Sequence, residues 1–215
     1  MSRLPVLSLA GATLAIGFLP WHPAPKPASA AGDSVSVAVF AGGCFWGVEG
    51  VFEHLKGVVS ATAGYAGGTV DRPSYEAVSS GTTGHAESVR VVFDPAVISY
   101  RQLLEVFFLV AHDPTELDRQ GPDVGTQYRS IVFYRNDDQR DQANAYIAEL
   151  NSTHRFAAAI VTEVVPLKAF FPAEAYHQRY MMRHPDQPYI VFNDSPKLVQ
   201  LHRQFPSLYV DLRGE

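Results

Sequence analysis

The most informative pattern of hydrophobic and polar residues lies near the start of the chain. Residues 34–40 alternate between the two kinds of side chain, with valine at every second position, which predicts a β-strand. Glycines follow, and hydrophobic residues then recur at helical spacing, at Phe45, Val48, Phe52 and Leu55. This spacing predicts a helix that Gly57 ends. Cys44 therefore stands at a strand-to-helix turn, in the first turn of the helix.

The same patterns divide the rest of the chain into strands, helices and loops. Further strands are predicted at 58–65, 87–93, 128–134 and 160–166, and further helices at 99–110, 137–150 and 174–184. The segments 66–84 and 112–125 are long enough for us to expect functional loops. The mixture predicts an α+β fold, a ferredoxin-like two-layer sandwich with a mixed β-sheet core, plus long ordered loops.

Residues 1–30 have the order of a secretory signal peptide: Arg3, then an apolar run, then the small residues Ala28-Ser29-Ala30. We therefore predict export to the periplasm and a single mature domain spanning residues 31–215. An uncleaved membrane anchor is the alternative, because the apolar run approaches the length that spans a bilayer. After cleavage we expect no stable association with a membrane.

Charge and cysteine content narrow the classes of function. The formal net charge is −5, so the chain lacks the basic surface that binds nucleic acid or an anionic membrane. Its single cysteine, Cys44, has no internal partner for a disulfide in an oxidising compartment. The alternatives are an intermolecular disulfide, a reactive thiol, or a buried and inert side chain.

The surroundings of Cys44 favour a reactive thiol. The dipole and free N–H groups of a helix N-terminus stabilise a thiolate, so we expect a lowered pKa for Cys44. Trp46 falls outside the apolar series of the helix and is expected to form a wall for a small alkyl group. Phe45 belongs to that series, so packing in the core is an equal alternative for it.

Other polar residues are placed to assist a nucleophile. Glu87 heads a row of apolar residues on one face of a predicted strand, so burial would raise its pKa and make it a general acid. A solvent-exposed strand end is the alternative. Asp123, Tyr128 and Tyr75 lie where they can reach a shared pocket. If they take no part in catalysis, Asp123 is a turn residue and the two tyrosines are aromatic residues of the core.

Six motifs occur in one order along the chain: GGCFWGVE, GYAGG, SYEAV, TGHAE, HDPTELDRQGPDVGTQYRS and FFPAEAYHQRY. Together they resemble the A-type peptide methionine sulfoxide reductases. The resemblance runs from about residue 37 to about residue 205, which is nearly the whole of the predicted mature domain.

The resemblance implies a catalytic domain that reduces the S epimer of methionine sulfoxide, free or in proteins, and so repairs oxidised proteins. It implies that Cys44 attacks the sulfoxide sulfur and ends as a sulfenic acid. Glu87 would protonate the sulfoxide oxygen as that oxygen leaves sulfur.

The family pattern also implies roles for the remaining candidates. Tyr75 and Tyr128 would hydrogen-bond the sulfoxide oxygen, and Asp123 would orient this network through water. Phe45 and Trp46 would hold the methyl group on the substrate sulfur.

The chain departs from the family pattern near its C-terminus. Many relatives carry one or two further cysteines there, whereas Tyr189 and Ile190 stand about where one is expected. We therefore expect a one-cysteine form, which a small thiol or a thioredoxin-like protein regenerates. No cofactor is predicted, and the histidines show no spacing typical of metal ligands.

Two other classes of function are compatible with a lone cysteine. A cysteine hydrolase would use Cys44 as nucleophile, His85 as base and Asp123 to orient the base. A secreted binding module with an incidental cysteine would have an unreactive thiol. The series of motifs argues against both.

Overall fold

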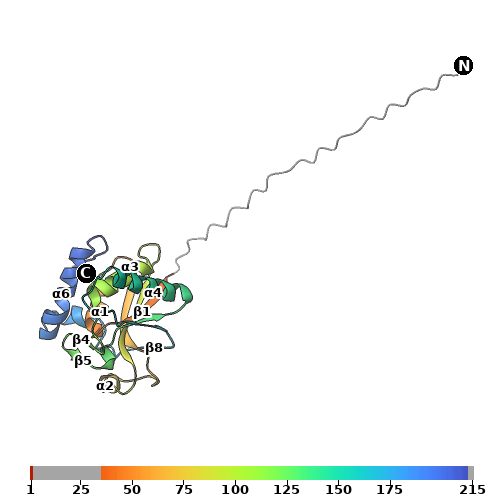
Figure 1. Cartoon of the computed structure of the whole chain (residues 1–215). Coiled ribbons are helices and arrows are strands. Elements are labelled where there is room, and N and C mark those ends of the chain that lie inside the picture. Colours follow the sequence, from red (N-terminus) through yellow and green to blue (C-terminus); the bar gives the residue numbers. More distant parts are fainter. Residues whose placement is uncertain (2–34, 213–215) are drawn as a thin grey trace. The chain divides into compact units, whose positions relative to one another are not determined.

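The computed structural model describes residue 1 and residues 35–212. The predicted signal peptide, apart from Met1, lies outside the described residues and stays a prediction. Figure 1 shows the described elements coloured along the chain. No helix among these residues is both long enough and apolar enough to cross a membrane.

A mixed six-stranded β-sheet forms the centre of the fold. Its order is β7-β6-β1-β3-β2-β8, with β6 and β7 parallel and all other neighbours antiparallel. Its strands are β1 (Ser36–Ala41), β2 (Val58–Ala66), β3 (Ala86–Phe93), β6 (Ile131–Tyr134), β7 (Glu163–Pro166) and β8 (Phe170–Pro172). A second, two-stranded sheet pairs β4 (Arg119–Gln120) with β5 (Asp123–Val124).

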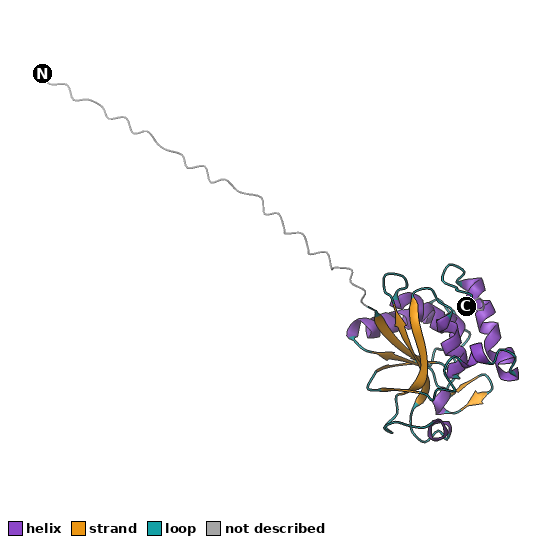
Figure 2. Cartoon of the chain, turned by 180° about the vertical axis from the view of Figure 1, so that it is seen from behind, coloured by secondary structure: helices purple, strands orange, loops and turns teal. Residues whose placement is uncertain are grey.

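The longer helices pack on one face of the six-stranded sheet, as Figures 1 and 2 show for α1, α3 and α4. The α-helices are α1 (Phe45–Glu53), α2 (Tyr75–Ser79), α3 (Tyr100–Val106), α4 (Asp137–Ser152), α5 (Tyr180–Arg183) and α6 (Ser195–Gln204). Shorter helical turns are η1 (Phe107–Ala111), η2 (Thr126–Tyr128) and η3 (Ile190–Asp194). Because η3 runs directly into α6, these two elements form one continuous C-terminal segment.

The side chains of β1 alternate between the two faces of the sheet and enter two hydrophobic cores. Ala38 and Phe40 belong to the larger core, which the helices cover. Val39 and Ala41 belong to a smaller core on the opposite face. All four side chains are fully buried, so β1 is a central strand in packing as well as in sheet order. The position of its C-terminal end is therefore firmly fixed.

The α+β class and the mixed sheet are confirmed, and most predicted elements form close to their expected positions. The strand predicted at 34–40 is β1, and the helix that follows the glycines is α1. The strand predicted at 128–134 starts only at Ile131, because the helical turn η2 extends to Tyr128. The two-layer and ferredoxin-like descriptions stay predictions.

The predicted helix at 174–184 is wrong over its first half. Only α5 is helical, and residues 175–179 form turns. Arg179 has a left-handed backbone with φ of 54°, and its N–H donates to Glu49 Oε2 at 2.8 Å. The carboxylate of the active-site helix α1 thus stabilises a turn that the periodicity of the segment does not indicate.

Both long loops are ordered and contain short elements. α2 lies in the first loop, where the Ser74 hydroxyl caps it by accepting the N–H of Ala77. β4 and β5 lie in the second loop, which packs against Gly43. Gly43 has φ of +89°, and a Cβ there would lie 2.6 Å from Gln120 Cβ. Glycine is therefore required where the chain turns from β1 toward α1.

We predict that Phe40 contributes several kcal/mol to the free energy of unfolding. Its buried ring stacks on Phe107 at 4.8 Å and on Phe52 at 5.2 Å between ring centroids. Phe40→Ala should lower the free energy of unfolding by about 3–5 kcal/mol, because truncation leaves a cavity. Urea unfolding followed by circular dichroism measures this change.

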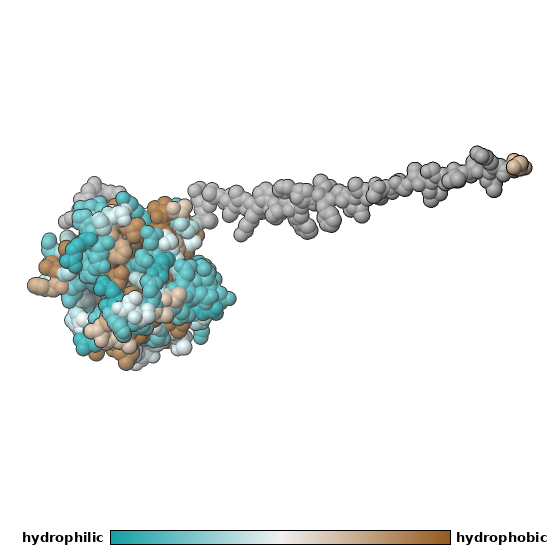
Figure 3. All heavy atoms as spheres, turned by 45° about the horizontal axis from the view of Figure 1, so that its top comes forward, coloured by the Kyte–Doolittle hydropathy of each residue, from teal (hydrophilic) through white to brown (hydrophobic). Residues whose placement is uncertain are grey.

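Phe192→Ala is the matched control, because the Phe192 side chain is 77% exposed. On the face shown in Figure 3, exposed hydrophobic residues form separate areas among hydrophilic ones, as expected of side chains outside the core. Truncating an exposed side chain should change the free energy of unfolding by less than about 0.5 kcal/mol. Equal losses in the two variants would contradict the central position given to Phe40.

Candidate active site

Cys44 is the N-cap residue of α1, as the sequence pattern predicts. Its backbone has φ of −54° and ψ of 122°, between the end of β1 and the first helical residue. The side chain is half-buried and makes no capping hydrogen bond to the helix. The thiol thus lies at the positive end of the helix dipole and remains reachable from solvent.

The expected lowering of the Cys44 pKa is wrong. Burial raises the pKa of the thiol well above its ordinary value, and the nearby Glu87 and Asp194 carboxyl groups raise it further. The backbone N–H of Trp46 and the Lys197 ammonium lower the pKa, but by less than the other groups raise it. Desolvation and negative charge therefore outweigh the helix N-terminus, and Cys44 rests as the neutral thiol.

Glu87 is buried beside the start of the same helix. Its side chain is only 2% exposed, so the alternative of an exposed strand end is wrong. Its Oε2 accepts the N–H of Phe45 at 3.0 Å. Burial raises the pKa of Glu87 to about 8, and the charge of Asp123 adds to this effect. Glu87 is therefore mainly protonated at neutral pH, as a general acid must be.

Tyr75 and Tyr128 approach this pair from α2 and η2, and both are half-buried. Burial raises the pKa of each hydroxyl, and the charges of Glu87 and Cys44 raise it further. Both phenols therefore stay protonated and can donate a hydrogen bond. The structure places both predicted tyrosines within the electrostatic reach of the thiol and the acid.

Asp123 lies on β5 and accepts a hydrogen bond from the Tyr189 hydroxyl. Burial raises the Tyr189 pKa, and the charges of Cys44 and Asp123 raise it further, so this phenol also lies close to the thiol. The sequence pattern assigned no site role to Tyr189. The only signal for it was its place where relatives are expected to carry a cysteine.

Phe45 and Trp46 point to different surroundings. Phe45 is 1% exposed and packs in the larger core, with its ring centroid 5.0 Å from that of His177. Trp46 is half-buried, and its indole N–H donates to His177 Nδ1 at 3.1 Å. The Tyr180 ring stacks on Trp46 at 3.8 Å. His177 and Tyr180 were not predicted as site residues.

His85 does not serve Cys44 as a base. Its Nδ1 accepts the N–H of Gly68 at 3.1 Å, and its Nε2 lies 2.8 Å from the Val70 carbonyl oxygen. Both ring nitrogens are therefore engaged within the loop between β2 and β3. The arrangement that a Cys44–His85–Asp123 hydrolase requires is absent, and the hydrolase alternative is not supported.

No group of three or more histidine, cysteine, aspartate or glutamate residues suited to a metal ion occurs within residues 35–212. The site consists instead of a thiol, a protonated carboxyl group, phenol hydroxyls and aromatic rings. A soft nucleophile, proton donors and an apolar wall suit a substrate with a polar oxygen on a sulfur that carries an alkyl group.

Comparisons with known proteins agree with this chemistry. The family model of peptide methionine sulfoxide reductase matches residues 36–208. Peptide methionine sulfoxide reductase MsrA 2 of Mesorhizobium japonicum is 54% identical over 172 residues, covering 80% of this chain and 88% of the relative. The MsrA of Thermus thermophilus is 49% identical, covering 80% of this chain and 96% of the relative.

Solved structures show the same similarity. Reduced Mxr1 from Saccharomyces cerevisiae has a TM-score of 0.67 and 36% identity, covering 71% of this chain and 87% of that one. Methionine sulfoxide reductase A of Corynebacterium diphtheriae has a TM-score of 0.63 and 32% identity, covering 72% and 77%. The chain therefore belongs to the peptide methionine sulfoxide reductases of the A type, the enzymes that reduce methionine sulfoxide.

Proposed function

We propose that the chain reduces the S epimer of methionine sulfoxide, free or within oxidised proteins, using Cys44 and Glu87. One observation carries this proposal. The lone thiol stands at the N-cap of α1, and the N–H of the next residue donates to the buried Glu87 carboxyl group at 3.0 Å. Because the nucleophile and the proton donor lie on adjoining rigid elements, both can act on one sulfoxide group of the substrate.

The first step moves one oxygen atom from substrate to enzyme. The Cys44 sulfur attacks the sulfoxide sulfur, and Glu87 donates a proton to the oxygen, which gains electron density. That oxygen leaves the substrate sulfur and ends on Cys44, and the thiol proton replaces the one that Glu87 gave. The products are methionine and the sulfenic acid of Cys44.

Other side chains hold the substrate for this step. The Tyr75 and Tyr128 hydroxyls donate to the sulfoxide oxygen, and Asp123 orients the network through water and through Tyr189. The Trp46 indole, held by its hydrogen bond to His177 and its stacking on Tyr180, forms the apolar wall for the methyl group. The buried Phe45 ring supports this wall by packing on His177. Apolar contact and directed donors together orient the bound sulfoxide.

The second step needs an electron donor from outside the chain. Sulfenic acids condense with thiols to form disulfides, and the chain has no cysteine other than Cys44. A small thiol or a thioredoxin-like protein forms a mixed disulfide with Cys44, and a second thiol then releases the enzyme in its reduced form. The oxygen of the sulfenic acid leaves as a water molecule when the mixed disulfide forms.

The cellular setting is part of the same proposal. The charged, apolar and small-residue order of residues 1–30 supports export to the periplasm as a single catalytic domain, residues 31–215. The strand order β6-β1-β3-β2, all antiparallel, supports a ferredoxin-like core with helices on one face.

Replacing Cys44 tests the assignment of the nucleophile. Cys44→Ser changes one atom, so the fold should persist, but reduction of methionine sulfoxide with dithiothreitol should fall below detection. The unmodified enzyme should consume purified S epimer and leave the R epimer unchanged, as chromatography of the products would show. Turnover by Cys44→Ser would contradict the mechanism, and turnover of the R epimer would contradict the choice of epimer.

Replacing Glu87 tests the acid. Glu87→Gln should lower kcat by about a hundred- to ten-thousandfold near neutral pH, because the amide cannot donate the proton. In the unmodified enzyme the acid must be protonated, so kcat should fall as the pH rises through about 8. Steady-state rates between pH 6 and pH 10 measure both effects.

Glu76→Gln is the control for this experiment. Glu76 is exposed on α2 beside Tyr75, so its variant should keep both the rate and the decline above pH 8. A loss below about tenfold in Glu87→Gln would show that another group is the principal proton donor.

A one-cysteine cycle predicts a single turnover when no reductant is present. The enzyme should form about one methionine per active site and stop, since no other thiol in the chain resolves the sulfenic acid. Mass spectrometry of the stalled enzyme should find one added oxygen, trapped at Cys44 by a sulfenic-acid reagent. Added thiol should restore turnover, whereas repeated turnover without thiol would refute the cycle.

A further inference from the structure

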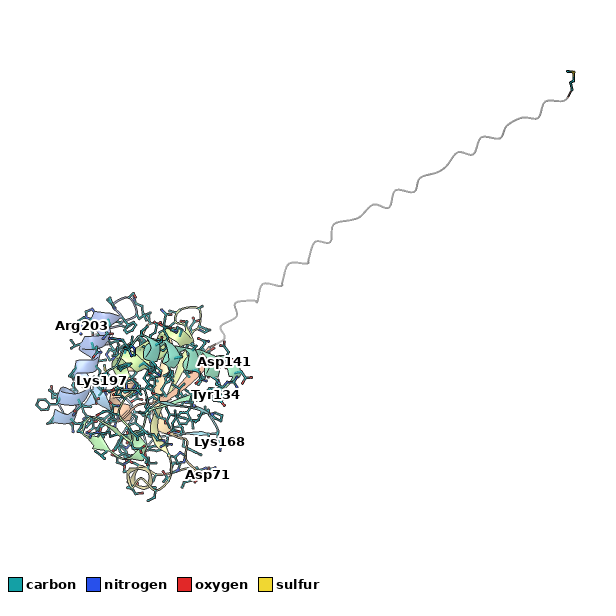
Figure 4. The ribbon with its side chains drawn as sticks, in the orientation of Figure 1. Asp71, Tyr134, Asp141, Lys168, Lys197 and Arg203 are labelled. Carbon is teal, nitrogen blue, oxygen red and sulfur yellow. The ribbon has the colours of Figure 1, made fainter. Side chains whose placement is uncertain are left out.

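The C-terminal segment of η3 and α6 packs directly against the first turn of the active-site helix. Gly47 of α1 marks the contact. A Cβ at Gly47 would lie 2.0 Å from Asp194 Oδ1 and 2.7 Å from Lys197 Nζ. Figure 4 labels Lys197 on α6. The absence of a side chain at Gly47 therefore lets an ion pair pack against the backbone of α1, three residues after Cys44.

Asp194 is only partly neutralised by this ion pair. Its side chain is fully buried, and its Oδ1 accepts from Lys197 Nζ at 3.0 Å. Its Oδ2 is also buried and has no hydrogen-bond partner among the described residues. Buried carboxylate oxygens almost always have partners, because an unpaired one is costly. The retention of this unpaired oxygen next to the active site calls for a functional explanation.

The position of Asp194 explains which group it affects. Cys44 precedes Gly47 by three residues at the start of α1, and positions three apart on a helix are neighbours at about 5–6 Å. The ionisable side chains that face Cys44 are Glu87 of β3, Tyr75 of α2, Tyr128 of η2, Tyr189, Asp194 of η3 and Lys197 of α6. Asp123 acts on Glu87 and Asp194.

These facing groups differ in the charge that they bring. The phenols are neutral, and Glu87 is mainly protonated near neutral pH. Burial raises the pKa of Asp194, and the Lys197 ammonium opposes this effect and favours the ionised carboxylate. At neutral pH Asp194 is therefore the main negative charge beside Cys44, and Lys197 is the opposing positive charge. Glu87 adds a second negative charge above a pH of about 8.

We propose that Asp194, held by Lys197 against Gly47, is a positioning residue whose negative charge adds to burial in holding the lone Cys44 sulfur in its neutral SH form in the free enzyme. The benefit is chemical protection. Oxidants and disulfides react with the thiolate rather than the thiol, and overoxidation beyond the sulfenic acid is irreversible. A chain without a second cysteine cannot protect its nucleophile by forming an internal disulfide. The inference rests on the proposed role of Cys44 as nucleophile.

Alkylation of Cys44 across pH tests this inference without any turnover. Asp194→Asn keeps the shape of the side chain and an acceptor for Lys197 but removes the negative charge. Iodoacetamide alkylation, followed by intact-protein mass spectrometry, should show a midpoint lowered by about one pH unit. Below the midpoint the alkylation rate should rise about tenfold. Inactivation by hydrogen peroxide should accelerate in the same proportion.

Two further variants make the result specific. Lys197→Met removes the positive charge, so the midpoint of alkylation should rise and the rate should fall. Asp186→Asn removes a negative charge from an exposed position in the same region, so its profile should match that of the unmodified enzyme. Circular dichroism of each variant checks that the fold is retained.

The outcomes separate this inference from the proposed function. Unchanged alkylation profiles in folded Asp194→Asn and Lys197→Met would overturn the role of the ion pair, even if the enzyme reduces the S epimer. A shift of the same sign in both variants would also overturn it, because a loosened structure rather than charge would then explain the change. Opposite shifts support it, whether or not Cys44→Ser abolishes turnover.

Discussion

The hydrogen bond from the Phe45 N–H to Glu87 Oε2, at 3.0 Å, is the contact on which the active site depends. It joins the first residue of α1 to β3, which is the neighbour of β1 in the sheet. The donor is one of the N–H groups that a helix leaves unpaired at its N-terminus, so its use costs the helix nothing. It fixes the acid beside the thiol because both partners are buried and belong to regular elements.

Burial, more than charge pairing, determines the protonation states in this site. Glu87 is almost fully buried with one backbone donor, and its pKa is raised to about 8. Glu174 is also subject to burial, but the Tyr75 N–H and the Tyr65 hydroxyl donate to it at 2.9 and 2.8 Å, and its pKa is lowered. The same side chain thus becomes an acid where it is almost fully buried with one donor, and a structural anion where it is only half-buried and has several donors.

The sequence allowed prediction of those features that local patterns encode. The turn at Cys44 follows from a change in periodicity, and the burial of Glu87 follows from the apolar face of its strand. The raised pKa of Cys44 was not predictable, because burial of the thiol, its main cause, and the approach of Asp194 both depend on tertiary packing. Tyr189 was missed for the same reason, since its partner Asp123 is distant in sequence. The turn at Arg179 depends on Glu49, which no local signal could reveal.

The indole of Trp46 and its partner His177 are 131 positions apart in the chain. Contacts of such long sequence separation form late, because the intervening chain must first be ordered. During synthesis the cysteine emerges early, yet His177, Asp194 and Lys197 join the site only when the last quarter of the chain folds onto α1. Catalytic competence is therefore a property of the completed fold, and an incomplete or partly unfolded molecule carries an ordinary thiol instead of an enzyme's nucleophile.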